Sequence, residues 1–151
     1  MTVNKVNPGQ RRKARRLAIQ ALYQWQVAET PVTQIEAEFL ADNDMAKVDK
    51  EYFCELLRGV PKFQSEFDDL IGKYTDRTSS EMTPIELAIL RIGTYELIHR
   101  IDVPYKVVIN EGVELSKIFG ANEAHRFVNG VLDQLAQELR MPEVKHNQDA
   151  P

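Results

Sequence analysis

The stretch that decides the fold is TPIELAILRIGTYELIHR, residues 83–100. It opens with a helix-start signal, because Thr83 can cap a helix, Pro84 suits the first helical position and Glu86 completes a capping box. The residues that follow are apolar on almost every side of a helix, which is typical of a helix that other helices surround. We therefore predict a central helix from residue 83 to about Arg100 in an all-α fold.

Two helical patterns lie on the carboxyl-terminal side of this stretch. The first begins near residue 102 and ends at Gly120, which we place at the position just after the helix. The second is capped by Asn122 and stopped by Pro142. Residues 142–151 are polar, and we expect them to form a disordered tail.

Three helical patterns precede the central stretch, over residues 10–28, 33–41 and 49–74. Pro61 lies inside the longest of them and should kink or split that helix, because proline has no N–H to donate. Residues 1–9 have no apolar periodicity, and we expect a mobile arm there. No alternating strand pattern competes anywhere. The sequence thus predicts a single all-helical domain over residues 10–141, a compact bundle of about seven helices.

Composition excludes several classes of protein. The chain has 151 residues, 43% of them hydrophobic, with seven glycines and seven prolines, and no apolar run approaches the length of a membrane helix. Cys54 is the only cysteine, and His99, His125 and His146 are not at metal-ligand spacing. We expect a cytoplasmic, non-enzymatic protein with no metal, no cofactor and no membrane partner.

The net charge of −4 is distributed unevenly along the chain. Residues 1–28 contain six Lys or Arg and no acidic residue, a charge of +6, and the remaining 123 residues therefore carry −10. A basic segment of this kind on an otherwise acidic protein indicates local contact with a polyanion.

The basic residues lie on one helix, and its geometry predicts which of them act together. At about 100° per residue, Arg12, Arg16 and Tyr23 lie within about 40° of one another, with Ile19 beside them and away from the apolar stripe. The flanking basic side chains are Arg11 and Arg15 on one side and Lys13 on the other. Arginines neutralise phosphates and an aromatic ring can stack on an unpaired base. The alternatives are a basic segment that only keeps the chain soluble, and a Tyr23 buried under a second helical layer.

Four motifs in order along residues 10–140 resemble the NusB family of transcription antitermination factors. The motifs are Arg11–Arg16 with Ala21–Trp25, Ile89–Leu97, Asp102–Glu111 and Phe127–Asp133. The resemblance implies two packed helical sub-bundles in one fold. It also implies binding of boxA single-stranded RNA together with the ribosomal protein NusE. In that family this pair joins RNA polymerase and other Nus factors, which promotes transcription of ribosomal RNA operons.

The resemblance also carries over site residues where the motifs match. The RNA-binding residues it implies on the first helix are Arg11, Arg12, Lys13, Arg15, Arg16 and Tyr23. Near the last helix it adds Glu123, Arg126 and Phe127, although Phe127 also fits the core. Expected contacts to NusE are Glu86, Arg91 and Glu96, whose other interpretation is surface charge or, for Glu86, a helix cap. Gly93 and Gly112 stand where the family commonly has alanine, which is costly in a helix unless close packing requires glycine.

Two other functions fit the pattern. One is the isolated amino-terminal RNA-binding domain of a ribosomal RNA cytosine methyltransferase, which resembles this family but is joined to a catalytic domain that these 151 residues do not contain. The other is a helical scaffold that binds only protein, in which the arginine face would have no role.

Overall fold

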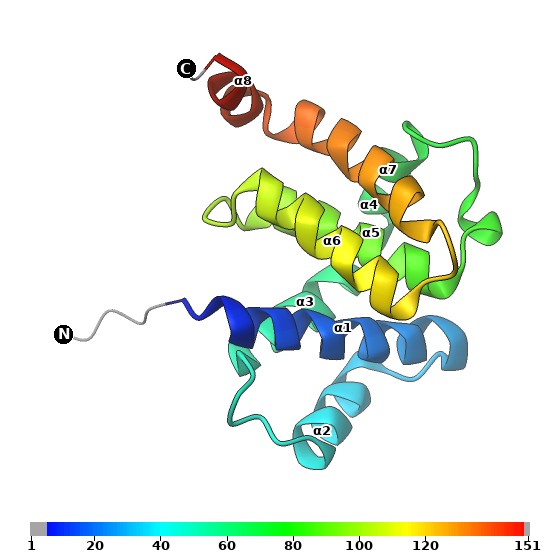
Figure 1. Cartoon of the computed structure of the whole chain (residues 1–151). Coiled ribbons are helices and arrows are strands. Elements are labelled where there is room, and N and C mark those ends of the chain that lie inside the picture. Colours follow the sequence, from blue (N-terminus) through cyan, green and yellow to red (C-terminus); the bar gives the residue numbers. More distant parts are fainter. Residues whose placement is uncertain (1–5, 150–151) are drawn as a thin grey trace. The chain divides into compact units, whose positions relative to one another are not determined.

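The computed structural model of the chain describes the backbone of residues 6–149, and every regular element in that range is a helix (Figure 1). The elements are α1 (Pro8–Ala28), α2 (Val32–Asp42), α3 (Lys50–Lys62), α4 (Gln64–Gly72), the short 3₁₀ helix η1 (Ser79–Glu81), α5 (Pro84–His99), α6 (Tyr105–Phe119), α7 (Ala124–Leu139) and α8 (Met141–Asp149). The all-α prediction is confirmed, with one α-helix more than expected. The chain divides into two compact units at Pro61, and each is described here by itself.

The first unit contains α1, α2 and nearly all of α3. The α1 helix begins at Pro8, two residues before the predicted start, because the Asn7 side chain accepts a hydrogen bond from the Gln10 N–H at 3.1 Å and caps the helix. The Phe39 ring of α2 stacks on Phe53 of α3 with 5.8 Å between centroids. Residues 1–5 of the expected arm lie outside the described residues.

Pro61 divides the long predicted helix, as expected. It lies in the last turn of α3, which ends at Lys62, and α4 begins at Gln64 after the non-helical Phe63. Since proline cannot donate to the carbonyl one turn earlier, the backbone hydrogen-bond ladder is interrupted there. The second unit begins at Lys62, directly after Pro61.

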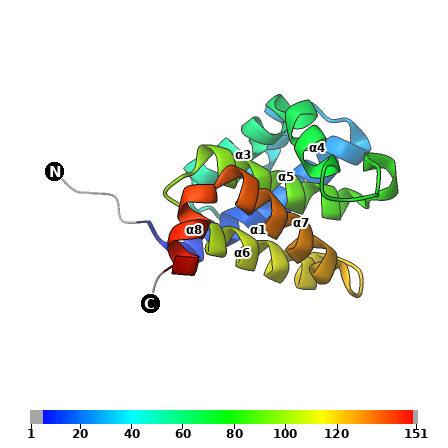
Figure 2. The same cartoon turned by 90° about the horizontal axis from the view of Figure 1, so that it is seen from above.

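The second unit is built around α5, where every residue from Glu86 to Leu97 is buried. The predicted capping box is present, since the Glu86 N–H donates to the Thr83 hydroxyl at 3.1 Å and the Glu86 carboxylate accepts from the Thr83 N–H at 3.2 Å. The α6 and α7 helices pack on α5 and on each other, as both views show (Figures 1 and 2). The prediction of a central, enclosed helix is confirmed.

The turn between α6 and α7 differs from the sequence prediction. Gly120 caps α6 in an extended conformation, with its N–H donating to the Ser116 carbonyl at 2.8 Å, instead of following the helix in the left-handed region. A Cβ there would lie 2.6 Å from the Ser116 carbonyl oxygen, so close approach of backbone explains the glycine. Glu123, at φ 71°, takes the N-cap position that we assigned to Asn122, and its side chain makes no capping hydrogen bond.

Residues that were expected to form a disordered tail form α8 as far as Asp149, whereas Pro151 lies outside the described residues. Arg140 explains why the chain stays ordered after α7. Its buried guanidinium donates to four backbone carbonyls at the end of α5 and in the turn after it, at 2.7–3.1 Å. Its Nη1 also binds Glu143 of α8 at 2.6 Å, and Glu143 accepts from the Tyr105 N–H that starts α6. This network joins α8 to the rest of the second unit.

Candidate nucleic-acid interface

The exposed face of α1 carries three cations and one aromatic ring. Arg12, Lys13 and Arg16 are exposed, and Tyr23 follows two turns later with 43% of its surface accessible. Lys13 and Arg16 form no ion pair with any residue in the described part of the chain. At Lys13 and Arg16 this face therefore presents positive charge that no carboxylate of the described residues pairs with, and Tyr23 beside them has ring surface available for stacking.

Arg11 and Arg15 lie elsewhere. They are 8% and 3% exposed, and both guanidinium groups approach the ring of Tyr52 on α3, at 4.4 and 5.5 Å from its centroid. The Arg11 Nε also lies 3.6 Å from an Asp49 carboxylate oxygen. A cation over an aromatic ring is stabilised most where water is excluded. Two of the five predicted basic contacts thus hold the first unit together.

The helical angles predict that Ile19 lies beside Arg12, Arg16 and Tyr23, away from the buried side of α1. This prediction is wrong, because Ile19 is fully buried. The buried side of α1 is wider than its stripe of alanines and leucines indicates, since it also includes Arg11, Arg15 and Ile19. Tyr23 lies about 40° from Ile19 around the helix and remains on the exposed side, as the helical angles predict.

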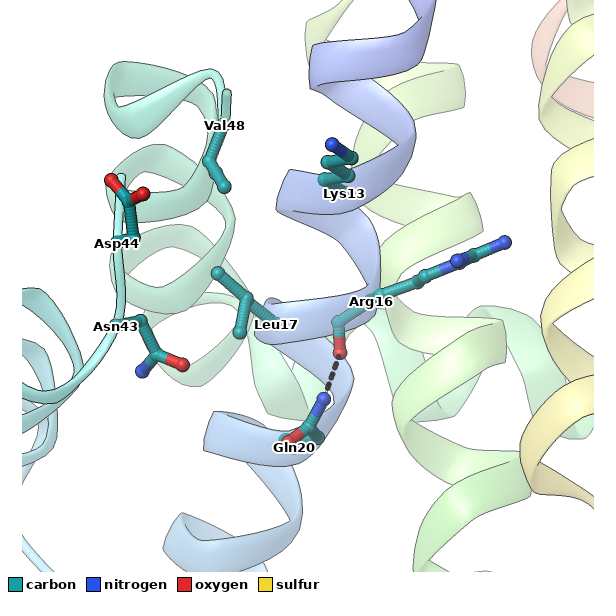
Figure 3. Close-up of a pocket in the computed structure, with 7 residues that line it drawn as sticks. All are labelled: Lys13, Arg16, Leu17, Gln20, Asn43, Asp44 and Val48. Atoms are coloured by element: carbon teal, nitrogen blue, oxygen red, sulfur yellow. Dashed lines mark hydrogen bonds between the residues drawn. The ribbon is translucent and has the colours of Figure 1, made fainter. Parts of the chain in front are cut away.

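A groove borders this face, between α1 and the loop that leads to α3 (Figure 3). Its volume is about 280 Å³, and Leu17 extends across it from α1 toward the loop. The lining residues are Lys13, Arg16, Leu17 and Gln20 from α1, and Asn43, Asp44 and Val48 from the loop. The Asp49 N–H donates to the Gln10 carbonyl at 3.1 Å and fastens the loop to α1. No local pattern in the sequence indicates this groove, because it depends on a tertiary contact between distant segments.

The candidates at the start of α7 form a second, separate group in the other unit. Glu123 and Arg126 are exposed and pair at 3.0 Å. Phe127 is half-buried, and the Arg77 guanidinium lies over its ring at 4.1 Å from the centroid. Arg77 in turn binds Glu86 at 3.0 Å. Phe127 is therefore neither a core residue nor a fully exposed ring, because the Arg77 guanidinium covers one face of it.

The three residues expected to contact a protein partner are all buried. Glu86 is 7% exposed and is occupied by its helix cap and by Arg77. Arg91 is 3% exposed and makes two hydrogen bonds of 2.8 Å to Asp68 of α4. Glu96 is 1% exposed. Polar residues in a helix enclosed on all sides find partners inside the fold, so none of the three presents an exposed side chain to a protein partner.

Cys54 of α3 is a free, buried cysteine. Burial and the neighbouring Glu36 carboxylate raise the pKa of the Cys54 thiol, which makes the reactive thiolate scarcer. No group of three His, Cys, Asp or Glu side chains among the residues described is placed to hold a metal ion. Within the same residues, no helix is long and apolar enough to cross a membrane.

Comparison with known proteins gives consistent matches over most of the chain. The model of the NusB family matches residues 12–137. Transcription antitermination protein NusB of Marinobacter nauticus is 57% identical over 137 residues, 91% of this chain and 87% of that protein. The protein of the same name from Alcanivorax borkumensis is 54% identical over 140 residues, 93% of both chains.

Solved structures agree with this result. T. maritima NusB superimposes with a TM-score of 0.77 at 32% identity, covering 89% of this chain and 94% of that one. A chain from a crystal structure of the antitermination factors NusB and NusE in complex with dsRNA gives a TM-score of 0.73 at 26% identity, covering 84% and 96%.

Proposed function

The chain belongs to the NusB family, and on that premise we propose that it is a cytoplasmic transcription antitermination factor. It binds boxA RNA together with NusE, and the pair joins RNA polymerase with other Nus factors on ribosomal RNA operons. A relative of similar fold was crystallised with NusE and dsRNA, which supports a role in RNA binding together with NusE. The protein acts by binding and assembly and catalyses no reaction.

The observation that carries the proposal is the exposed face of α1. Lys13 and Arg16 have no carboxylate partner in the described chain, so no internal ion pair has to break when a phosphate binds them. Arg12 and Tyr23 share that face, and the tyrosine ring can stack on a base whatever the base's identity. We propose these four residues as the principal RNA contacts, and Arg126 with Phe127 as a second contact region.

Arg11 and Arg15 act indirectly in this proposal. Their stacking on Tyr52 fixes α1 against α3, which orients the exposed cations. We expect no direct phosphate contact from either of them. Glu86, Arg91 and Glu96 likewise support the fold, and the NusE surface is proposed to lie elsewhere on the second unit.

The test is fluorescence anisotropy with a labelled boxA RNA, a scrambled RNA of the same length and a duplex of the boxA sequence, with and without NusE. We expect NusE to tighten binding of the boxA strand over the scrambled strand. Replacement of Arg12 and Arg16 by alanine should weaken binding, and each lost phosphate contact should reduce the slope of log affinity against log salt by about 0.7. Tyr23→Ala should cost about 1–3 kcal/mol of binding free energy if the ring stacks on a base.

Arg58→Ala is the matched control, because it removes one arginine from the same unit. That arginine lies on α3 and is already neutralised by Glu36 at 2.7 and 2.8 Å. It should leave both the affinity and the salt slope unchanged. Equal binding of boxA and scrambled RNA, with no effect of NusE, would remove the proposed function. If the protein binds NusE but neither RNA strand, the protein-only scaffold is favoured instead.

A further inference from the structure

We propose that the groove between α1 and the loop Asn43–Val48 holds one unpaired guanine base of the RNA bound along the exposed face of α1. This inference rests on the proposed RNA-binding function and adds a specificity site to it. The phosphate contacts of α1 carry no sequence information by themselves, whereas groups that reach a base edge do. The groove borders those cations directly, since Lys13 and Arg16 belong to both.

The size of the groove fits one ring system. Its volume of about 280 Å³ lies just below the range of about 300–1,000 Å³ in which pockets hold drug-sized molecules. Leu17 and Val48 come from opposite sides and give it an apolar floor against which the flat face of a base can pack (Figure 3). The polar side chains stand around this floor. An apolar floor with a few placed polar groups is the general construction of a specific small-ligand site.

The hydrogen bonds within the loop determine which polar atoms remain available. The Asn43 amide nitrogen donates to the Phe39 carbonyl at 3.0 Å, and its carbonyl oxygen points toward α1 (Figure 3). One Asp44 carboxylate oxygen accepts the Ala46 N–H at 3.0 Å, and its second oxygen has no hydrogen bond from any described residue. The Gln20 amide nitrogen donates to the Arg16 carbonyl at 3.4 Å, so its oxygen also remains as an acceptor. The loop and α1 thus offer three side-chain acceptors.

This set of acceptors selects a base by its donors. Guanine has two adjacent donors on its Watson–Crick edge, the N1–H and the N2 amino group, beside the O6 acceptor. Asp44 and Asn43 can accept from the two donors, and Lys13 can donate to O6. Uracil has a single N–H between two carbonyl oxygens. One of these oxygens would face the carboxylate of Asp44, and two acceptors repel each other. Adenine and cytosine each have an amino group next to an unprotonated ring nitrogen, and that nitrogen would also face an acceptor.

The experiment measures boxA RNA affinity by anisotropy for a set of strands in which each guanine in turn is replaced by inosine, which lacks only the N2 amino group. At one position the replacement should weaken binding to the unmodified protein about tenfold, the loss expected when one hydrogen bond to a charged acceptor is removed. Asp44→Asn should bind the guanine and inosine strands equally at that position, because it removes the acceptor for the N2 amino group. Asn43→Ala removes the acceptor for N1–H, which both bases have, so it should weaken both strands alike and keep the preference. The asparagine of Asp44→Asn can still accept the Ala46 N–H, so the loop conformation is kept.

Asp42→Asn is the matched control, because it makes the same change at the exposed end of α2 outside the groove, and it should keep the tenfold preference. Thermal unfolding followed by circular dichroism verifies that each variant is folded. If RNA binds but no inosine strand binds more weakly, or if Asp44→Asn keeps the full preference, the guanine site is refuted while RNA binding stands. If no RNA binds even the unmodified protein, the proposed function itself fails.

Discussion

Leu132 of α7 packs between two glycines that belong to different helices, and this contact leads to our most specific stability prediction. A Cβ added to Gly93 of α5 would lie 2.6 Å from one terminal methyl of Leu132, and a Cβ added to Gly112 of α6 would lie 2.5 Å from the other. Carbon atoms pack best at about 3.5–4.0 Å. Leu132 is fully buried, so it has little room to move away.

The magnitude follows from two opposing terms. Replacing glycine by alanine inside a helix stabilises it by about 1 kcal/mol, because alanine loses less backbone entropy. Overpacking a dense core costs about 1–3 kcal/mol. Gly93→Ala and Gly112→Ala should therefore change the free energy of unfolding by about 0–2 kcal/mol in the destabilising direction. Gly130→Ala in α7 has no atom within 4 Å of the new methyl group, and it should stabilise by about 1 kcal/mol.

Urea denaturation followed by circular dichroism at 222 nm measures these differences, with the slope checked for constancy across the variants. The decisive comparison is between Gly93→Ala and Gly130→Ala, the same chemical change at two helix positions. A second comparison uses Leu132→Ala, which costs about 2–5 kcal/mol but removes both terminal methyls. In that background Gly93→Ala should become stabilising. If Gly93→Ala stabilises the unmodified protein as much as Gly130→Ala does, the reasoning about close packing is wrong.

Two further predictions concern charged groups in the second unit. Arg140→Ala should lower the free energy of unfolding by about 3–5 kcal/mol in the same urea assay, because four backbone carbonyls lose their donor. Arg140→Lys should recover only part of the lost stability, because an ammonium group lacks the planar fork of donors. The Tyr74 hydroxyl and Lys73 lower the pKa of the Glu138 carboxyl, so its contribution to stability is present at neutral pH and is lost as the pH falls through that lowered pKa. Urea midpoints at pH 7 and pH 3 should therefore differ less in Glu138→Gln than in the unmodified protein, and an equal difference would contradict this assignment.

The sequence was sufficient for those parts of the fold that local signals control. The capping box at Thr83, the enclosed central helix and the break after Pro61 each depend on residues within one or two turns. The ordering of the chain beyond α7 was missed for the opposite reason. It depends on Arg140 reaching carbonyls about 40 residues away in the sequence. A polar segment after a proline resembles a tail unless that distant contact is known.

The candidate site was predictable to the level of the helix face, and tertiary contacts decided the rest. Helical angles correctly placed Arg12, Arg16 and Tyr23 together on the exposed side. They could not show that Tyr52 lies against the neighbouring side of α1 and takes up two further arginines. No local pattern in the sequence marks a tyrosine on α3 as the partner of residues some 40 positions earlier.

This division of the basic residues has a consequence for how RNA affinity should respond to mutation. Arg11 and Arg15 are buried against the Tyr52 ring and present little surface to a phosphate, so they should contribute to the stability of the first unit and not to the salt slope of binding. Arg12, Lys13 and Arg16 are exposed, and the loss of any of them should change the salt slope with little effect on unfolding. The +6 charge of the amino-terminal segment thus overstates the charge available to a polyanion, because two of its six cations are used to fix α1 in place.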